Sequence, residues 1–251
     1  MDRHTLLSVK GLEIGYGKNK IIGDIKFELH SGEIAAVMGP NGVGKSTLLR
    51  ALSGLLPPIS GKVLLDNRDI YSGGRDNLKR NARQISILTT AKVDAELMSV
   101  SEVVESGRYM HSGIFGRISD ADREKAKEII HLVGLDAIKD AAFSKLSDGQ
   151  KQRVMLGRAI CKEPELLVMD EPLTFLDIKY KQELIYILKS LAHKANIGII
   201  ISLHEPEDVR KLADRVLTLK DGGMKDFLDG TDKLNENYIK SLFDLAEISN
   251  E

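Results

Sequence analysis

One segment limits the fold of this chain more than any other, Gly39–Thr47, which reads GPNGVGKST. It matches the G-x-x-x-x-G-K-[ST] phosphate loop. The apolar run Ile34–Met38 before it is typical of a buried strand, and Lys45–Leu56 after it has leucines at helical spacing. A strand, a glycine-rich loop and a helix in this order direct backbone N–H groups and a helix N-terminus at one anion. The segment therefore predicts an α/β chain that binds a nucleoside triphosphate.

The whole loop is expected to form the phosphate site. Its residues are Gly39, Pro40, Asn41, Gly42, Val43, Gly44, Lys45, Ser46 and Thr47. The glycines let the backbone wrap around phosphates without Cβ clashes. The Lys45 ammonium reaches the β- and γ-phosphates, and the Ser46 hydroxyl ligates Mg²⁺.

Two acidic residues follow a second buried run. Leu166–Met169 has the composition of a buried strand, and Asp170 and Glu171 come directly after it. In an open α/β sheet, ligands bind at the carboxyl ends of the strands. Asp170 is suited to hold Mg²⁺ through water, and Glu171 to take a proton from an attacking water. The alternative is that both are surface acids that end a strand.

The pentapeptide LSDGQ, Leu146–Gln150, lies shortly before these acids. It opens a segment, Gln150–Cys161, with apolar residues at helical spacing. Ser147 is the expected N-cap of that helix. Alone, such a pentapeptide indicates no more than a loop–helix junction. A helix N-terminus here would, however, be a second anion site in the same chain.

With these three motifs in this order, the chain resembles the ATP-binding-cassette (ABC) ATPases over nearly its whole length. The resemblance implies an α/β P-loop NTPase with a mainly parallel core sheet, an N-terminal antiparallel β part and an inserted α-helical subdomain. It implies a single ABC ATPase domain over residues 1–251. Within it, residues 1–92 and 153–225 form the nucleotide-binding core lobe, 93–152 the helical subdomain with the signature loop, and 226–251 a C-terminal tail helix.

In that family LSDGQ is the signature loop, which completes the ATP site of the opposite subunit. The resemblance implies a head-to-tail homodimer in which Ser147, Gly149 and Gln150 close over ATP bound by the other chain. Asp148 stands where the family most often has glycine. A carboxylate that faced the γ-phosphate would repel it, so the Asp148 side chain is expected to face away.

Three further residues match single positions of the family. Tyr16 would stack on adenine, Asp177 would lie in the D-loop at the dimer interface, and His204 would be the switch histidine that contacts the γ-phosphate. Tyr16 could also be an exposed strand-end aromatic, Asp177 an N-cap, and His204 a partly exposed polar residue. The implied cofactors are ATP and Mg²⁺, and the implied reaction is ATP hydrolysis by Glu171 with His204.

One residue of the family pattern is missing. The family usually places a glutamine at the end of the strand after the first lobe, and aligning Ile85–Thr90 leaves Thr90 at that position. Threonine is shorter, so it would contact the metal only through water. Gln84 comes too early to replace it. Hydrolysis is expected to survive, since Glu171 and His204 remain.

The composition bears on the partners. A chain of 251 residues with 42% hydrophobic content can bury a large core. Its net charge of −1 gives no broad basic field, so nucleic acid is not an expected partner. The single cysteine, Cys161, allows no internal disulfide and suits a reducing compartment. The first residues lack a signal-peptide core, and no apolar run approaches the roughly 18 residues of a membrane span.

Periodicity predicts the remaining elements. The expected strands are Leu6–Tyr16, Ile22–Leu29, Gly61–Leu65, Ile197–Leu203 and Val216–Leu219. The expected helices are Lys181–Ala195, Glu207–Ala213 and Asn235–Ala246. Ser99 and Ser119 each precede an acid by three residues, the spacing of a capping box, and Gly134 is expected to end a helix.

Three uses of the ATP compete. A simple P-loop switch or kinase would need neither LSDGQ nor His204. A soluble ABC ATPase, for iron–sulfur assembly, DNA repair or translation, is the alternative to a transport ATPase. Val103–Tyr109 resembles a stretch of the ATPases of iron-siderophore, haem and cobalamin importers, although Arg108 within it could be an ordinary solvated helix-end charge.

We therefore expect the ATPase of an importer of such metal chelates. The resemblance implies an integral-membrane permease as its partner and, through the permease, an extracytoplasmic substrate-binding protein. It also implies a cytoplasmic location, peripheral on the inner face of the cell membrane.

Overall fold

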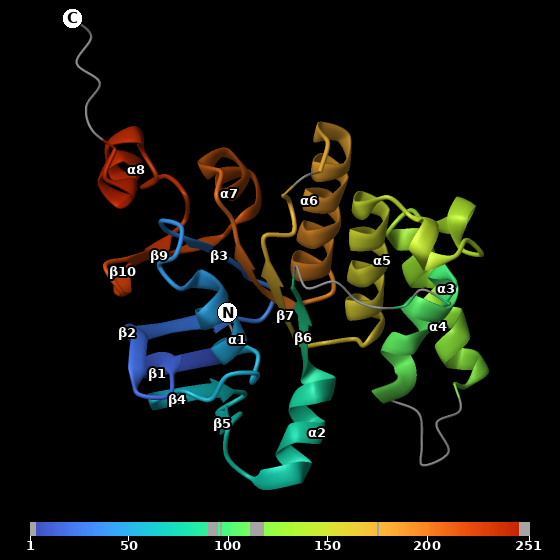
Figure 1. The fold of residues 1–251 in the computed structure, drawn as a ribbon, viewed down its shortest axis with the longest axis horizontal. Coiled ribbons are helices and arrows are strands. Elements are labelled where there is room, and N and C mark those ends of the chain that lie inside the picture. Colours follow the sequence, from blue (N-terminus) through green and yellow to red (C-terminus); the bar gives the residue numbers. More distant parts are fainter. Residues whose placement is uncertain (1–3, 90–94, 96, 111–117, 175, 246–251) are drawn as a thin grey trace, which may run out of the picture.

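A single sheet of ten strands runs through the molecule, with helices packed along it (Figure 1). The computed structural model describes residues 4–89, 95, 97–110, 118–174 and 176–245. The strands are β1 (Thr5–Tyr16), β2 (Asn19–His30), β3 (Ile34–Met38), β4 (Ser60–Leu65), β5 (Arg68–Asp69), β6 (Ile85–Leu88), β7 (Leu166–Asp170), β8 (Gly198–Ser202), β9 (Arg215–Lys220) and β10 (Gly223–Asp229). The α-helices are α1 (Lys45–Leu52), α2 (Gly74–Gln84), α3 (Val100–Glu105), α4 (Asp120–Leu132), α5 (Asp148–Cys161), α6 (Ile178–His193), α7 (Pro206–Leu212) and α8 (Glu236–Phe243). Short 3₁₀ helices are η1 (Ser106–Met110), η2 (Asp136–Ile138) and η3 (Phe143–Lys145).

Five of the ten strands form the predicted parallel core. The strand order is β5-β4-β1-β2-β10-β9-β3-β8-β7-β6, and the run from β9 to β6 pairs in parallel. β3 and β8 are buried at every residue, which is typical of parallel strands covered on both faces. The carboxyl ends of β3, β7 and β8 therefore meet at one edge, where the sequence placed its phosphate loop and acids.

The predicted N-terminal antiparallel part is also present. β1 pairs antiparallel with β2 and with β4, and β4 pairs with β5. β10 joins the two parts, because it pairs antiparallel with β9 and touches β2 through the pair Gly223–Gly23. The sequence predicted no strand over the residues of β10. A register shift between Met224 and Asp226 breaks the alternation that would have marked a strand.

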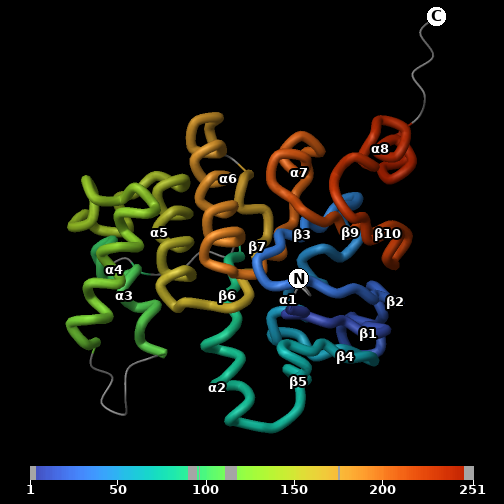
Figure 2. The backbone as a smooth tube through the Cα atoms, turned by 180° about the vertical axis from the view of Figure 1, so that it is seen from behind, coloured from blue at the N-terminus to red at the C-terminus, as the bar shows by residue number. Residues whose placement is uncertain are grey.

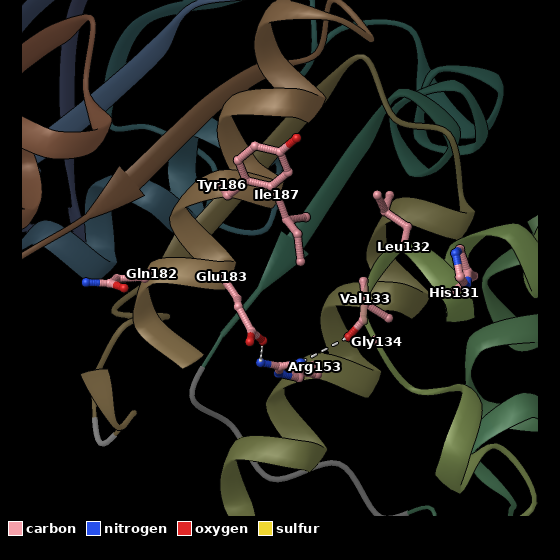
Figure 3. Close-up of a pocket in the computed structure, with 9 residues that line it drawn as sticks. All are labelled: His131, Leu132, Val133, Gly134, Arg153, Gln182, Glu183, Tyr186 and Ile187. Atoms are coloured by element: carbon pink, nitrogen blue, oxygen red, sulfur yellow. Dashed lines mark hydrogen bonds and ion pairs between the residues drawn. The ribbon is translucent and has the colours of Figure 1, made fainter. Parts of the chain in front are cut away.

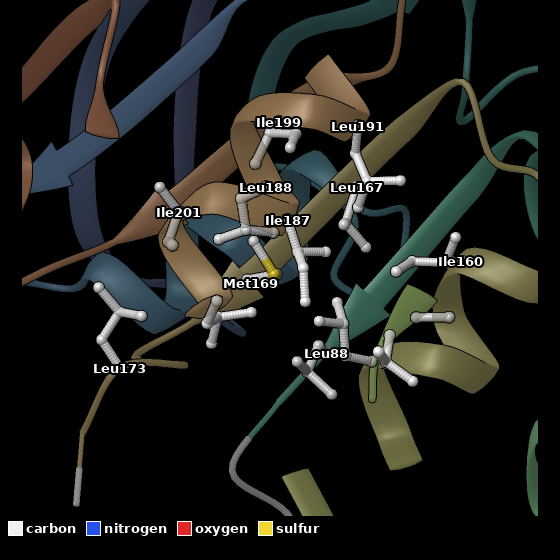
Figure 4. Packing of buried hydrophobic residues seen from close by; sticks show 14 of the residues in the cluster. Leu88, Ile160, Leu167, Met169, Leu173, Ile187, Leu188, Leu191, Ile199 and Ile201 are labelled. Carbon is white, nitrogen blue, oxygen red and sulfur yellow. The ribbon is translucent and has the colours of Figure 1, made fainter. Parts of the chain in front are cut away.

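Residues of the parallel strands alternate between two hydrophobic clusters. Leu167, Met169, Ile199 and Ile201 pack in the cluster that includes α5 and α6 (Figure 4). Their neighbours Leu166, Val168 and Ile200 pack in the other cluster, with α1, β1 and β2. This alternation is the two-residue period of a strand, so the sheet separates two cores and holds its edge residues in fixed register.

A group of helices lies on the far side of α6 from β1 and β2 (Figures 1 and 2). It contains α3, α4 and the side of α5 that packs on them. The Ser99 and Ser119 capping boxes are both formed, so these two predictions are confirmed. α4 ends at Leu132, shortly before Gly134, also as predicted.

Arg108 is not a solvated helix-end charge, and that interpretation is wrong. The residue is 8% exposed. Its Nε donates to Asp122 Oδ1 at 2.8 Å, and its Nη1 donates to Glu163 Oε2 at 2.8 Å and to the Cys161 carbonyl at 2.9 Å. Hydrogen bonds from Ser119 and Arg108 lower the pKa of Asp122 to about 2. Arg108 therefore ties η1 to α4 and to the end of α5.

Some helix predictions need correction. α1 ends at Leu52 and not at Leu56, and Gly54 and Pro57 follow it. α2 was not predicted at all, because its buried residues are Asn77 and Asn81. Asn235, the first residue of the predicted last helix, is instead the N-cap of α8, while Ala246 lies outside the described residues. Among the residues that the structure describes, no helix is both long and apolar enough to cross a membrane.

Candidate functional site

The phosphate loop joins β3 to α1, as the sequence predicted. Gly44 precedes α1 with φ 105°, and a Cβ there would lie 2.6 Å from Ile22 Cδ1. Gly39 has φ 155°, and a Cβ there would lie 2.4 Å from the Leu219 carbonyl oxygen. Only glycine fits at both positions. Since Gly44 has no side chain to cap α1, the first N–H groups of that helix stay available to a ligand.

Lys45 lies inside this loop. It is 6% exposed, and its Nζ donates to the carbonyl oxygens of Gly39 at 2.8 Å and Pro40 at 3.0 Å. Burial lowers the pKa of Lys45, while the nearby carboxylates of Glu171 and Asp170 act in the opposite direction. The structure thus brings the loop lysine and the two predicted acids into one electrostatic environment.

The two acids end β7 in different backbone conformations. Asp170 is the last residue of the strand, whereas Glu171 has φ 50°, in the left-handed region. The Ser202 hydroxyl at the end of β8 donates to Asp170 Oδ1 at 2.7 Å and accepts from the Glu171 N–H at 2.8 Å. This change of direction separates the two carboxylates, so they can serve different partners.

His204 follows the same end of β8. Its Nε2 lies 2.5 Å from Glu171 Oε1, a hydrogen-bond distance. Both side chains are about one-third exposed, at 35% and 30%. The predicted histidine and the predicted base are therefore direct neighbours, and solvent reaches them both.

The start of α5 is a closed capping box. The Gln150 N–H donates to Ser147 Oγ at 3.3 Å, and the Ser147 N–H donates to Gln150 Oε1 at 3.0 Å. The predicted N-cap is confirmed. Asp148 is exposed, and its direction relative to a bound phosphate stays a prediction. Figures 1 and 2 place α5 and α1 apart, with β6 and β7 between them.

The start of α6 lies beside the start of α5. Asp177 caps α6, because its Oδ1 accepts from the Tyr180 N–H at 2.9 Å. A Cβ on Gly149 would lie 3.5 Å from Leu176 Cδ2, and the Gln152 side chain donates to the Pro172 carbonyl. The predicted signature and D-loop residues are thus neighbours within one chain.

The remaining predicted residues are less connected. Tyr16 ends β1, is 49% exposed, and its hydroxyl accepts from Arg50 Nη1 at 3.3 Å. Thr90 lies outside the described residues. The Gln84 amide bonds Arg68 and Glu165 at the opposite end of β6, so Gln84 does not replace the missing glutamine.

Sequence reasoning missed two residues beside the acids and the histidine. One is Ser202, which could have been noticed as a polar residue at the end of an apolar run. The other is Lys181 on α6, whose Nζ lies 2.7 Å from Glu205 Oε2 and 2.6 Å from Asp208 Oδ2. Lys181 therefore links the first turns of α6 to the segment that follows His204. No sequence motif marks it.

A separate cavity of about 390 Å³ lies between α4, α5 and α6 (Figure 3). Arg153 crosses it, donating to Glu183 and, at 3.4 Å, to the Val133 carbonyl. The guanidinium also lies 4.2 Å from the Tyr180 ring centroid. Within the described part of the chain, none of the predicted site residues lines this cavity, so it is not the nucleotide site.

Comparison with known proteins agrees with this geometry. Residues 22–174 match the ABC transporter family. The iron(3+)-hydroxamate import ATP-binding protein FhuC of Bacillus subtilis is 30% identical over 243 residues, which cover 96% of this chain and 89% of FhuC. The phosphonates import ATP-binding protein PhnC 2 of Oceanobacillus iheyensis is 32% identical over 248 residues, which cover 95% and 96%.

A solved structure shares the fold. It is a transporter provisionally assigned to the metal-chelate ABC type, in an inward-facing conformation. Its matching chain has a TM-score of 0.81 and 28% identity, with 95% of this chain and 89% of that chain covered. The chain described here belongs to the ABC transporter family, as an ATP-binding subunit that hydrolyses ATP.

Proposed function

We propose that this subunit supplies ATP-driven closure and reopening to an importer of metal chelates such as iron-siderophore, haem or cobalamin. The observation that carries the ATPase part is the junction at the ends of β7 and β8. There Asp170, Glu171, Ser202 and His204 are linked by hydrogen bonds beside the Lys45 loop. Asp170 and Glu171 have different backbone conformations, and His204 is bonded to Glu171. This arrangement suits activation of a water next to a bound phosphate.

Mg²⁺ fits the oxygen donors at this edge. Ser46 offers a hydroxyl, and the carboxylate of Asp170 has one oxygen bonded to Ser202 and a second one left for a metal-bound water. The described residues hold no cluster of three or more His, Cys, Asp or Glu side chains suited to a metal, in keeping with an ion that takes its other ligands from water and phosphate. When bound, Mg²⁺ would neutralise charge on the β- and γ-phosphates. Thr90 is proposed to contribute only through water.

Each protein group then has a separate task. Tyr16 stacks on the base, and the Gly39–Thr47 loop and Lys45 bind the phosphates. Lys45 exchanges its bonds to the Gly39 and Pro40 carbonyls for phosphate oxygens. Glu171 takes the proton of the attacking water, and His204 holds the Glu171 carboxylate and contacts the γ-phosphate.

A second copy of the chain is proposed to complete each site. Within one chain α1 and α5 lie apart, with β6 and β7 between them (Figures 1 and 2), which supports a second copy as the source of Ser147, Gly149 and Gln150. In a head-to-tail homodimer they would meet the γ-phosphate of the other subunit, with Asp177 near the interface. ATP then holds the dimer closed, and hydrolysis removes the bridge. The division into a core lobe (1–92, 153–225), a helical subdomain (93–152) and a tail (226–251) is proposed on the same basis.

The transport part of the proposal rests on the family and on one stretch of sequence. FhuC imports an iron hydroxamate and PhnC 2 imports phosphonates, and their identities to this chain are 30% and 32%. Sequence identity to these relatives therefore does not indicate which substrate is transported. The Val103–Tyr109 stretch supports metal chelates. The proposed partners are an integral-membrane permease and, indirectly, an extracytoplasmic substrate-binding protein, with this subunit on the inner face of the membrane.

The test is to capture the partners of an ATP-locked form. Tagged Glu171→Gln protein is purified with ATP and Mg²⁺ from detergent-solubilised cells, and the proteins that come with it are identified by mass spectrometry. Glu171→Gln carrying Lys45→Ala is the control, because it should bind ATP about 10–100-fold more weakly. A polytopic permease in the first sample alone supports the transport role, and its cargo class then tests the chelate assignment. A soluble scaffold in its place would overturn the transport role.

A further inference from the structure

Ser202 is a buried hydroxyl at the meeting point of the two acids. It is the last residue of β8, its register partner in β7 is Asp170, and it is 0% exposed. The four residues before it in β8, Gly198–Ile201, have no polar side chain. A lone hydroxyl that ends such a strand, fully removed from water, must form its hydrogen bonds inside the protein.

The Ser202 hydroxyl bonds both acids at once. Its hydrogen is donated to Asp170 Oδ1 at 2.7 Å, and its oxygen accepts the Glu171 N–H at 2.8 Å. One hydroxyl can donate once and accept from another group, so both bonds form together. Ser202 therefore fixes the direction of the Asp170 carboxylate and the position of the Glu171 main chain.

The second of these bonds holds a strained residue. Glu171 has φ 50°, and a non-glycine residue in this region costs on the order of 1–3 kcal/mol unless its surroundings hold it there. Two residues at and after the end of β8 hold Glu171: Ser202 accepts its N–H, and His204 Nε2 lies 2.5 Å from its carboxylate. Loss of the Ser202 bonds would free both the strained peptide and the Asp170 carboxylate.

We propose that Ser202 is a positioning residue for ATP hydrolysis, acting through Asp170 and Glu171. This rests on the roles proposed above for those two acids. Ser202 touches neither the water nor the nucleotide in this assignment. Its effect is to keep the metal-side carboxylate and the base in the separate directions that hydrolysis needs.

The first test replaces Ser202 by alanine. Loss of a residue that orients groups around a metal and a base typically costs about 10–100-fold, so kcat should fall by about that factor. KM for ATP should change by less than about 3-fold, because the loss concerns the transition state more than ATP binding. Nucleotide affinity measured by fluorescence in EDTA should match the parent, while the increase in affinity on adding Mg²⁺ should be smaller than in the parent.

The chain offers a matched control in Ser86. It is 1% exposed in β6, and its Oγ donates to the Ala159 carbonyl at 3.0 Å, away from the acids. Ser86→Ala likewise removes a buried hydroxyl, from another strand of the same sheet. It should lower the melting temperature about as much as Ser202→Ala, with kcat unchanged.

Two more variants separate positioning from folding. Ser202→Thr keeps the hydroxyl and should recover most of the lost rate. If alanine or threonine does not fold, Ser202→Cys keeps the size with weaker hydrogen bonds, and its kcat should fall while Ser86→Cys retains the parental rate. When Glu171 is already replaced by Gln, adding Ser202→Ala should lower the remaining hydrolysis rate much less than it does in the parent. Both changes impair the same function, proton transfer from the attacking water.

The proposal is decided by comparing the Ser202 variants with the Ser86 variants. A rate loss and a weaker Mg²⁺ effect for Ser202 variants, both absent in the Ser86 variants, support it. Parental kcat in a folded Ser202→Ala or Ser202→Cys protein overturns it, as does an equal loss in the Ser86 control. Parental hydrolysis by Glu171→Gln alone would instead refute the proposed base, so the two failures are distinguishable.

Discussion

The two helix starts that the sequence marked as anion sites are built in opposite ways. α1 begins after Gly44, with no side chain over its first N–H groups, and Lys45 is buried against the loop carbonyls. α5 begins with Ser147 and Gln150 bonded to each other's backbone N–H groups. The first start is open to a ligand within one chain, whereas the second already satisfies part of its own hydrogen bonding. A helix N-terminus is thus not one kind of site, and its caps decide what it can bind.

The two starts also differ in what holds them. α1 follows directly from β3, in the middle of the sheet. α5 packs on α3 and α4, and Arg108 links this group through ion pairs with the mostly buried Asp122 and the half-exposed Glu163. The open start is therefore fixed by the sheet, and the capped start by a helix group with polar links.

The largest expected effect is on hydrolysis. Glu171→Gln should bind ATP like the parent and hydrolyse it ~10²–10⁴-fold more slowly, about 3–5 kcal/mol of barrier. The unhydrolysed γ-phosphate at α1 of one subunit can then bind the start of α5 of the other subunit. Light scattering should therefore show more dimer with ATP than with ADP. A parental rate of ATP turnover would show that Glu171 is not the base.

The next prediction compares how the starts of α1 and α5 contribute to ATP affinity. Lys45→Ala should weaken ATP binding by calorimetry by about 10–100-fold, as expected when a charged hydrogen-bond donor to phosphate is lost. Ser147→Ala, measured at concentrations where the chain is monomeric, should keep the parental affinity. Equal losses in both variants would contradict the difference between the open and the capped start.

A smaller effect concerns the helix group that carries α5. Hydrogen bonds from Ser119 and Arg108 lower the pKa of Asp122 to about 2, below its ordinary 3.8, so the charged carboxylate stabilises the fold above about pH 4 and this contribution is lost as pH falls toward 2. Asp122→Asn should lower the free energy of unfolding at pH 7 by about 2 kcal/mol in urea titrations. The loss should shrink below pH 4.

The control for that experiment is Asp120→Asn. Asp120 lies in the same first turn of α4, but its side chain is 98% exposed and pairs with the exposed Arg123. Such surface pairs contribute about 0–1 kcal/mol. If both variants unfold alike at pH 7, the buried pair does not hold this helix group.

The smallest effect is local to the capped start. Ser147→Ala should reduce the free energy of unfolding by about 1 kcal/mol, the usual contribution of a serine N-cap. Hydrogen exchange of the first α5 amides should become faster, while exchange in α1 stays as in the parent. Unchanged exchange at α5 would mean that the capping box contributes nothing to this helix end.

The sequence predicted the nucleotide edge well because its signals are local. The phosphate loop, the two acids and the histidine each follow a short apolar strand, and parallel strands bring their ends together. The same reasoning missed α2, whose buried positions are asparagines. Asn77 and Asn81 both donate to the Ile70 carbonyl, at 3.0 Å and 2.6 Å, so the helical period was carried by amides and not by apolar residues.

Other misses depend on partners far away in the sequence. Ser202 meets Asp170 and Glu171 only because β7 and β8 are in one particular register. Arg108 is buried because Asp122, Cys161 and Glu163 surround its guanidinium. Neither fact has a local pattern, so only the assembled fold could show it.

The capping box of α5 also has a consequence for the number of anions that one chain carries. A helix start with open N–H groups attracts phosphate. Because Ser147 and Gln150 bond to each other's backbone N–H groups, the start of α5 presents fewer open N–H groups in a lone subunit than the start of α1 does. We expect one nucleotide per isolated chain and two per dimer, and no phosphate bound at the start of α5 in an isolated chain.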